Sequence, residues 1–227
     1  MAPLDARLLA AASFVRRGAV LADVGTDHAY LPIYLIERGL ISRAVAADIG
    51  EGPIARARAH IAAAGYADRI ETVRTDGLCG LDACGITDIA ICGMGGELIA
   101  RILSDAPFTR DPAVRLILQP MTRAAVLRQY LAKNGFAMIA EKPCRAAGRV
   151  YSCLCASYDG VVRTLSPAEA EVGNPACETA EEQDAFRELL ARKIAATEVR
   201  IAALCGAGRA CDEDKALLEG LLQLQNR

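Results

Sequence analysis

The sequence predicts a doubly wound α/β fold of the Rossmann-like type, and three observations support this prediction. Short apolar runs alternate with helical patterns, as expected for parallel strands joined by right-handed crossovers. Glycines stand just past several expected helix ends, where a left-handed residue is favoured. The strand, glycine turn and helix at 21–35 form the unit with which α/β folds bind nucleotide-like ligands at the carboxyl edge of the sheet.

The first half of the chain supplies five elements in alternation. Apolar residues at three-to-four spacing predict a helix over 4–15, and an apolar run predicts a buried strand over 19–24. A helical pattern over 29–38 leads to a second strand over 43–48. A third helix follows over 52–64. This order already indicates a parallel sheet.

The same alternation continues after the third helix. Strands are expected over 70–74, 87–92 and 114–118, with helices over 96–104 and 122–133.

The last two expected strands lie close together in the sequence, over 136–142 and 149–157. The segment between them is too short for a crossover, so they should form a hairpin with one strand antiparallel. The result is a seven-stranded sheet with one reversed strand, the variant of the doubly wound fold that methyltransferases use.

A change of composition near Ser166 divides the chain into a catalytic domain over 1–160 and a helical domain over 166–227. A capping box over 179–182 predicts the start of a long helix, and a second helix follows over 212–224. The two should pack as an antiparallel, coiled-coil-like hairpin. The apolar stripe of the long helix consists of Phe186, Leu189, Leu190, Ile194, Thr197, Ile201 and Leu204.

Composition limits the classes of function. The 227 residues carry a net charge of −2, contain no Trp and are only 4% aromatic, so a base-stacking platform is not evident. Nine Cys without a C-x-x-C pair, together with two His, disfavour a zinc site, so no metal is expected. The thiols fit a reducing cytosol, and neither a signal peptide nor a membrane span is recognised. We therefore expect a cytoplasmic protein without a membrane partner. A monomer is the expected oligomeric state.

Two carboxylates mark the first strand and its turn. Asp23 lies inside the strand and Asp27 in the turn, where both would repel a bare phosphate but suit a cationic ligand such as S-adenosylmethionine (SAM). Gly25 would let the backbone approach that ligand closely. Taken alone, the residues are equally those of an ordinary strand-to-helix turn, and His28 those of a helix-starting hydrogen bonder.

Further polar or glycine-rich positions follow the next strands. Asp48 ends the second strand at close to the ~20-residue spacing of an acid that binds ribose hydroxyls, although it could also cap the next helix. Asp76 and Gly77 follow the third strand, as either adenine contacts or a simple turn. The glycines of 92–96 predict a backbone-lined floor after the fourth strand, and Gln119 lies on the same edge.

These segments resemble the bacterial tRNA (adenine-22-N1)-methyltransferases, a class I SAM-dependent family. The resemblance covers 4–158 and rests on D-V-G-T-D-H-A-Y-L-P, C-G-M-G-G and three shorter motifs. The five matching segments are 21–32, 47–53, 76–78, 92–96 and 118–120. The family also has a C-terminal coiled-coil-like domain.

The resemblance implies a SAM site in which the first turn lines the methionine part, the second strand tip holds the ribose and the third holds the adenine. The cofactor-binding residues it implies are Arg7, Gly25, Thr26, Asp27, His28, Asp48, Ile49, Asp76, Gly77, Gly93, Met94 and Gly95. The catalytic residues it implies, nearest to the methyl group and the target base, are Asp27, His28, Met94 and Gly95.

The implied reaction is transfer of a methyl group from SAM to N1 of an adenine in tRNA. Candidate phosphate contacts on the catalytic domain are Arg7, Arg16, Arg17, Arg123 and Arg128, and those on the helical domain are Arg187, Arg192, Lys193 and Arg200. All could also be solvated helix faces. A small-molecule methyltransferase, a nicotinamide oxidoreductase and a non-catalytic module that binds SAM and RNA remain alternatives.

Overall fold

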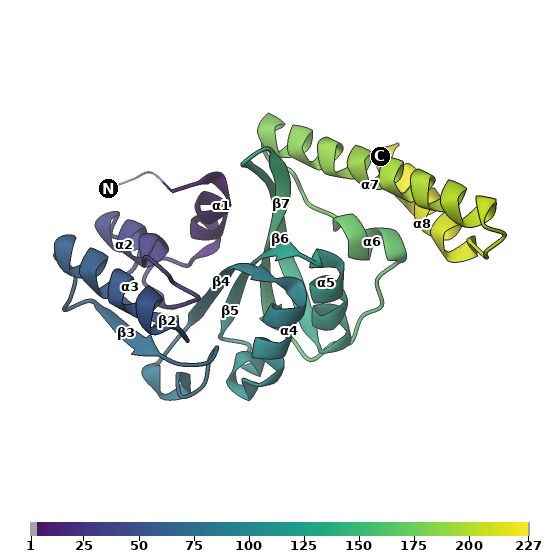
Figure 1. Ribbon diagram of the computed structural model, residues 1–227. Helices are drawn as coiled ribbons and strands as arrows, with labels where there is room; N and C mark the ends of the chain where they lie inside the picture. The colour runs from purple at the N-terminus through teal and green to yellow at the C-terminus, as the bar shows by residue number, and fades with distance from the viewer. Residues whose placement is uncertain (1–3, 227) are drawn as a thin grey trace.

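The computed structural model describes residues 4–226 and contains a seven-stranded sheet with helices on both faces (Figure 1). The strand order is β3-β2-β1-β4-β5-β7-β6. The strands are β1 Val20–Val24, β2 Arg43–Asp48, β3 Ile70–Arg74, β4 Asp88–Gly95, β5 Arg115–Thr122, β6 Phe136–Ala146 and β7 Arg149–Tyr158. The helices are α1 Ala6–Phe14, α2 Tyr30–Glu37, α3 Glu51–Ala63, α4 Gly96–Ser104, α5 Ala124–Lys133, α6 Pro167–Val172, α7 Ala180–Gly206 and α8 Asp212–Gln225, with 3-10 turns η1 Asp82–Cys84 and η2 Pro107–Arg110.

The predicted hairpin is confirmed, and β7 is the reversed strand. It pairs antiparallel with both β5 and β6, whereas the pairs formed by β1 to β5 are parallel. The connection between the two hairpin strands is shorter than the sequence predicted, because Ala147 and Gly148 alone form the turn. Both have positive φ, 49° and 70°, which matches the right-handed twist of the paired strands.

The side chains of β1 alternate between two cores. Leu21 packs with α1, α2 and α3 on one face of the sheet. Ala22 and Val24 pack with α4 and α5 on the other face. Asp23 therefore points to the same side as Leu21, toward α1 and α2. The carboxyl ends of β1 and β4, where the strand order reverses, form the topological switch point at which such sheets bind ligands.

Two of the parallel strands, β4 and β5, extend further than predicted. The sequence indicated strand ends at 92 and 118, but β4 continues to Gly95 and β5 to Thr122. Gly93 has a φ of 85° and sits at a register shift between the two strands, so the pairing resumes beyond it. The glycine segment is thus an irregular strand end rather than a free loop.

The C-terminal segment contains one helix that the sequence analysis missed. Helix α6 begins at a capping box formed by Ser166 and Glu169, with Pro167 at its first position. Its short length and its acidic composition hid the helical pattern. The long helix α7 begins at the predicted capping box of Thr179 and Glu182.

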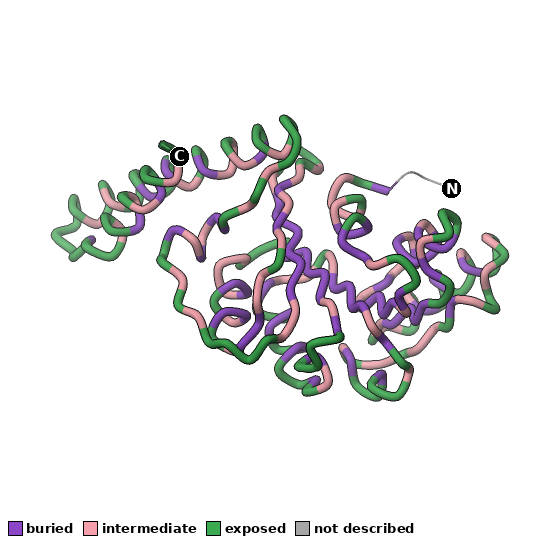
Figure 2. The backbone as a smooth tube through the Cα atoms, turned by 180° about the vertical axis from the view of Figure 1, so that it is seen from behind, coloured by how far each residue is buried: buried purple, intermediate pink, exposed green. Residues whose placement is uncertain are grey.

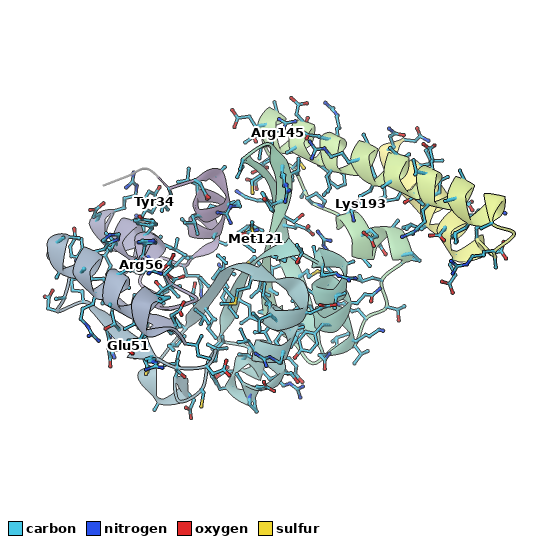
Figure 3. All side chains as sticks on the ribbon, in the orientation of Figure 1. Tyr34, Glu51, Arg56, Met121, Arg145 and Lys193 are labelled. Carbon is cyan, nitrogen blue, oxygen red and sulfur yellow. The ribbon has the colours of Figure 1, made fainter. Side chains whose placement is uncertain are left out.

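Helices α7 and α8 pack side by side and run out from the β6–β7 end of the sheet, away from α2 and α3 (Figure 1). Figure 2 shows buried residues concentrated in the central strands, whereas the outer end of this helical pair is exposed. Arg145, on the β6–β7 hairpin, bonds Glu188 of α7, and Lys193 of α7 bonds Glu171 of α6 (Figure 3).

A buried ion pair joins this C-terminal segment to the sheet. Arg128 of α5 is 1% exposed and pairs with Glu141 of β6. The guanidinium also donates to the carbonyls of Ala170 (2.9 Å) and Glu171 (3.1 Å) and to Ser152 Oγ (3.0 Å). All of its N–H donors therefore point at acceptors on α5's neighbours, so Arg128 is a structural residue and the prediction that it contacts phosphate is wrong.

Candidate active site

A cleft of about 590 Å³ opens at the carboxyl edge of the sheet, between the turn after β1, the end of β4 and the N-terminal part of α1. Six of the predicted cofactor-binding residues line this cleft, and some of the other lining residues are also polar. The lining residues are Leu4, Asp5, Arg7, Leu8, Asp23, Gly25, Thr26, Asp27, His28, Tyr30, Leu31, Cys92, Gly93 and Met121.

The turn between β1 and α2 has an unusual backbone. Gly25 has a φ of 78°, Asp27 one of 37° and Ala29 one of 54°. Left-handed conformations at residues other than glycine cluster at functional sites. The amides of Gly25 and Thr26 donate to the carbonyl of Ala47 at 2.8 and 3.1 Å, which fastens the turn to β2.

Asp23 lies beneath this turn and is 6% exposed. Thr26 Oγ1 donates to its carboxylate at 2.6 Å. Burial raises the pKa of Asp23 from 3.8 to about 6; the Thr26 hydrogen bond lowers the pKa, and the nearby Asp48 carboxylate raises it further. The structure thus keeps a buried carboxylate facing the cleft with one hydrogen-bond donor.

Asp27 and His28 are held by residues of α3 that the sequence analysis did not identify. Arg56 Nε donates to Asp27 Oδ1 at 3.0 Å (Figure 3). The His28 ring stacks on Tyr30 and on His60, with ring centroids 5.0 Å apart in both pairs. His28 Nε2 lies 3.3 Å from Asp27 Oδ2, while its Nδ1 is buried without a hydrogen-bond partner among the described residues.

The predicted ribose and adenine residues are not among those that line the cleft. Asp48 Oδ1 accepts a hydrogen bond from the Gly50 amide at 2.7 Å. The N-cap of α3 is Gly50, and no side chain caps the helix. Ile49 is 62% exposed. Asp76 and Gly77 line a second hollow of about 580 Å³, beside α4 and η2.

The glycines at the start of α4 differ in how much space a side chain would have at each position. A Cβ on Gly96 would lie 2.3 Å from the Arg123 carbonyl oxygen, so this residue must be glycine for packing. A Cβ on Gly95 would meet only Thr122 Oγ1, at 3.3 Å. The Met94 methyl lies against Gly25, where a Cβ would approach it to 2.3 Å. Met94 therefore covers the first turn instead of pointing outward from the floor.

Arg7 spans the mouth of the cleft. Its Nη1 donates to Gln119 Oε1 at 3.1 Å, and its Nε donates to Asp5 at 3.1 Å. The guanidinium also lies over the Tyr151 ring, 5.6 Å from its centroid. The sequence analysis missed Asp5, although its position as the N-cap of α1 could have been found from the short polar side chain before the helix.

The remaining arginines divide between the two edges of the sheet. Arg16 is bound to the buried Asp88 and to two carbonyls at the amino edge, and Arg17 follows it there, so neither lies near the cleft. Arg123 is 69% exposed and adjoins the start of α4, at the carboxyl edge. The cations predicted on α7 each form an ion pair, which reduces the charge they offer to a partner. These pairs are Arg187–Asp184, Arg192–Glu188, Lys193–Glu171 and Arg200–Asp214.

The described part of the chain offers neither a metal cluster nor a membrane-spanning helix. No group of three or more His, Cys, Asp or Glu side chains within 4–226 is arranged to hold a metal ion. Within the same residues, no helix combines the length and the apolar character needed to cross a membrane.

Comparison with known proteins identifies relatives of the whole arrangement. A family model described as a methyltransferase domain matches residues 4–154. The Bacillus subtilis tRNA (adenine(22)-N(1))-methyltransferase is 36% identical over 165 residues, which is 70% of this chain and 69% of that protein.

Solved structures extend the likeness to the C-terminal helices. The crystal structure of the Bacillus subtilis m1A22 tRNA methyltransferase superposes with a TM-score of 0.82 at 30% identity, covering 98% of this chain and 99% of that one. A Streptococcus pneumoniae protein in complex with S-adenosyl-L-methionine gives a TM-score of 0.82 at 32% identity, covering 96% and 98%.

Proposed function

This chain belongs to the tRNA (adenine-22-N1)-methyltransferase family, and from that premise we propose that it transfers a methyl group from SAM to N1 of adenine 22 in tRNA. The observation that carries the proposal is the 36% identity, over 165 residues, to an enzyme with this name. The methyltransferase-domain match over residues 4–154 spans every motif of the cleft. Because tRNA is the proposed substrate, we place the activity in the cytoplasm. We further propose that the protein acts as a monomer.

The charges that line the cleft suit a cationic ligand such as SAM. Asp5, Asp23 and Asp27 line it, and Asp48 lies close enough to raise the pKa of Asp23. A sulfonium and an ammonium group would be stabilised by these carboxylates. The flexible tip of Met94 covers Gly25, so this side chain would have to shift for a ligand to approach the Gly25 backbone closely.

We assign the predicted residues to parts of SAM on this basis. Gly25, Thr26, Asp27 and His28 would hold the methionine part, with Arg7 at the mouth. Asp48 and Ile49 would hold the ribose, and Asp76 and Gly77 the adenine. Gly93, Met94 and Gly95 would lie nearest to the methyl group and the target base.

Methyl transfer to adenine N1 does not require a general base to activate the nucleophile. Bound SAM supplies an electrophilic methyl group, and adenine N1 carries the lone pair that accepts it. The chain's own residues therefore act mainly by holding the base in line and by excluding water. N1 lies on the Watson–Crick edge, so the base must be unpaired or taken out of its stack before it can enter the cleft. Asp27 and His28 are the ionisable groups best placed to take the proton that later leaves the exocyclic amine.

We further propose that residues 1–160 form the catalytic domain and 166–227 a helical domain that helps to hold tRNA. The fixed attachment of α6 through Arg128 supports a helical pair with a constant direction relative to the cleft. The ion pairs on α7 indicate few phosphate contacts there.

The proposal is tested by incubating the protein with labelled SAM and an unmodified tRNA transcript that has adenine at position 22. The matched substrate is the same transcript with guanine at that position. We expect label in the first transcript and 1-methyladenosine after digestion to nucleosides, detected by mass spectrometry. Equal labelling of both transcripts would refute the position, and labelling of a metabolite pool without tRNA would favour the small-molecule alternative.

A further inference from the structure

Two cysteine thiols meet at the outer end of the helical pair. Cys205, near the end of α7, is exposed, and Cys211, directly before α8, is 6% exposed. Their sulfur atoms lie 3.0 Å apart, within ~1 Å of the length of a disulfide bond. None of the roles assigned above involves these two residues.

The backbone holds the two thiols in this arrangement. Helix α7 ends in a Schellman motif, in which the Gly208 amide donates to the Cys205 carbonyl at 3.0 Å and the Arg209 amide to the Leu204 carbonyl at 2.9 Å. An ion pair between Arg200 of α7 and Asp214 of α8 fixes the helices next to the loop. The Cys211 side chain makes no capping bond to the backbone of α8, and the Lys215 side chain is hydrogen-bonded to it.

We propose that Cys205 and Cys211 form a reversible intramolecular disulfide by exchange with a low-molecular-weight disulfide such as glutathione disulfide. The exposed Cys205 loses its proton to solvent, attacks one sulfur of glutathione disulfide and releases one glutathione thiolate. Cys211 then loses its proton and attacks Cys205 Sγ, which releases the second glutathione thiolate. Two protein thiols are oxidised, and one glutathione disulfide is reduced to two glutathione molecules.

The bond would link the end of α7 to the start of α8 across the loop 206–210. It would therefore restrict the motion of the loop at the tip of the helical pair, on the opposite side of the molecule from α1 and α2 (Figure 1). This site does not depend on the proposed methyl transfer, because no residue of the cleft takes part.

The test uses the full-length native protein and glutathione disulfide. Trypsin cleaves after Arg200, Arg209 and Lys215, which places the two cysteines in separate peptides, 201–209 and 210–215, with no other cysteine in either. We expect mass spectrometry to find these peptides linked, and two fewer free thiols than the nine of the reduced chain. Dithiothreitol should restore both thiols. Hydrogen exchange should slow at the amides of the loop in the oxidised form.

Matched variants separate this pair from the other thiols. Cys205→Ser and Cys211→Ser should each abolish the linked peptide, whereas Cys177→Ser should retain it with an unchanged yield. Linkage of either cysteine to a different one, or a stable glutathione adduct on Cys205 without ring closure, would overturn the proposal. So would the loss of two thiols in Cys205→Ser at the same rate as in the native protein.

Discussion

Asp23→Asn is expected to stabilise the folded protein at neutral pH. Burial raises the pKa of Asp23 from 3.8 to about 6, so its charged form is less favourable in the native state than in the unfolded state. Each pKa unit corresponds to ~1.36 kcal/mol, which gives a penalty of about 3 kcal/mol once the group is ionised in both states. Asparagine keeps the shape and an acceptor for Thr26 without the charge.

The sign of the pH dependence of stability follows from the number of protons bound to this residue in the native and unfolded states. Below 3.8 the carboxyl group is protonated in both states, so the native and variant proteins should differ little. Between 3.8 and about 6 the unfolded chain has lost the proton and the native state still holds it, so native stability falls as the pH rises. Above about 6 the whole penalty is present.

The assay is urea unfolding of the native protein and the variant across this pH range, with Asp68→Asn as a control because Asp68 is exposed. The free energy of unfolding of Asp23→Asn should exceed that of the native protein above about pH 6, and this difference should vanish below 3.8. The same variant should bind SAM more weakly in calorimetry, by about 1.5–3 kcal/mol, the value of a hydrogen bond to a charged group. A stability difference that is independent of pH would refute the reasoning.

Three further predictions concern the carboxyl edge. Asp48→Ala should weaken SAM binding by about 1.5–3 kcal/mol; unchanged affinity in calorimetry would exclude a ribose contact. Gly95→Val should fold and lose methyl transfer, whereas Gly96→Ala should lose about 1–3 kcal/mol in urea unfolding because its Cβ would clash with backbone; equal stability of the two variants would contradict this. Arg123→Ala should raise the KM for tRNA and reduce the salt dependence of binding by about one phosphate contact, while Arg17→Ala, at the opposite edge, should leave both unchanged.

Local sequence patterns predicted most of the fold. The bounds of β2, β3 and α4 agree with the sequence prediction to the residue, because each element ends where its apolar pattern gives way to a polar residue. The ends of β4 and β5 were misplaced, since a bulge at Gly93 lets strand pairing continue through residues typical of a turn. Helix α6 was missed because its six residues are too few to show a period.

The candidate site depends more on contacts between distant residues. The motif around Gly25 indicated the cleft, but nothing in the sequence of α3 shows that Arg56 and His60 reach Asp27 and His28. Arg128 has the sequence context of a solvated helix face. Its burial depends on Glu141 and on the carbonyls of α6, which only the tertiary structure brings together.

The bonds of Arg128 have a consequence for how the protein unfolds. If α6 detached while the sheet stayed folded, two of the acceptors of a buried guanidinium would be lost, and an incompletely compensated charge would remain inside the protein. Partial opening of this kind is unfavourable, so the sheet and the C-terminal helices should lose their structure in a single cooperative transition. Calorimetric and van't Hoff enthalpies should then agree for the whole chain, as they do for a two-state unit, despite the extended shape of the helical pair.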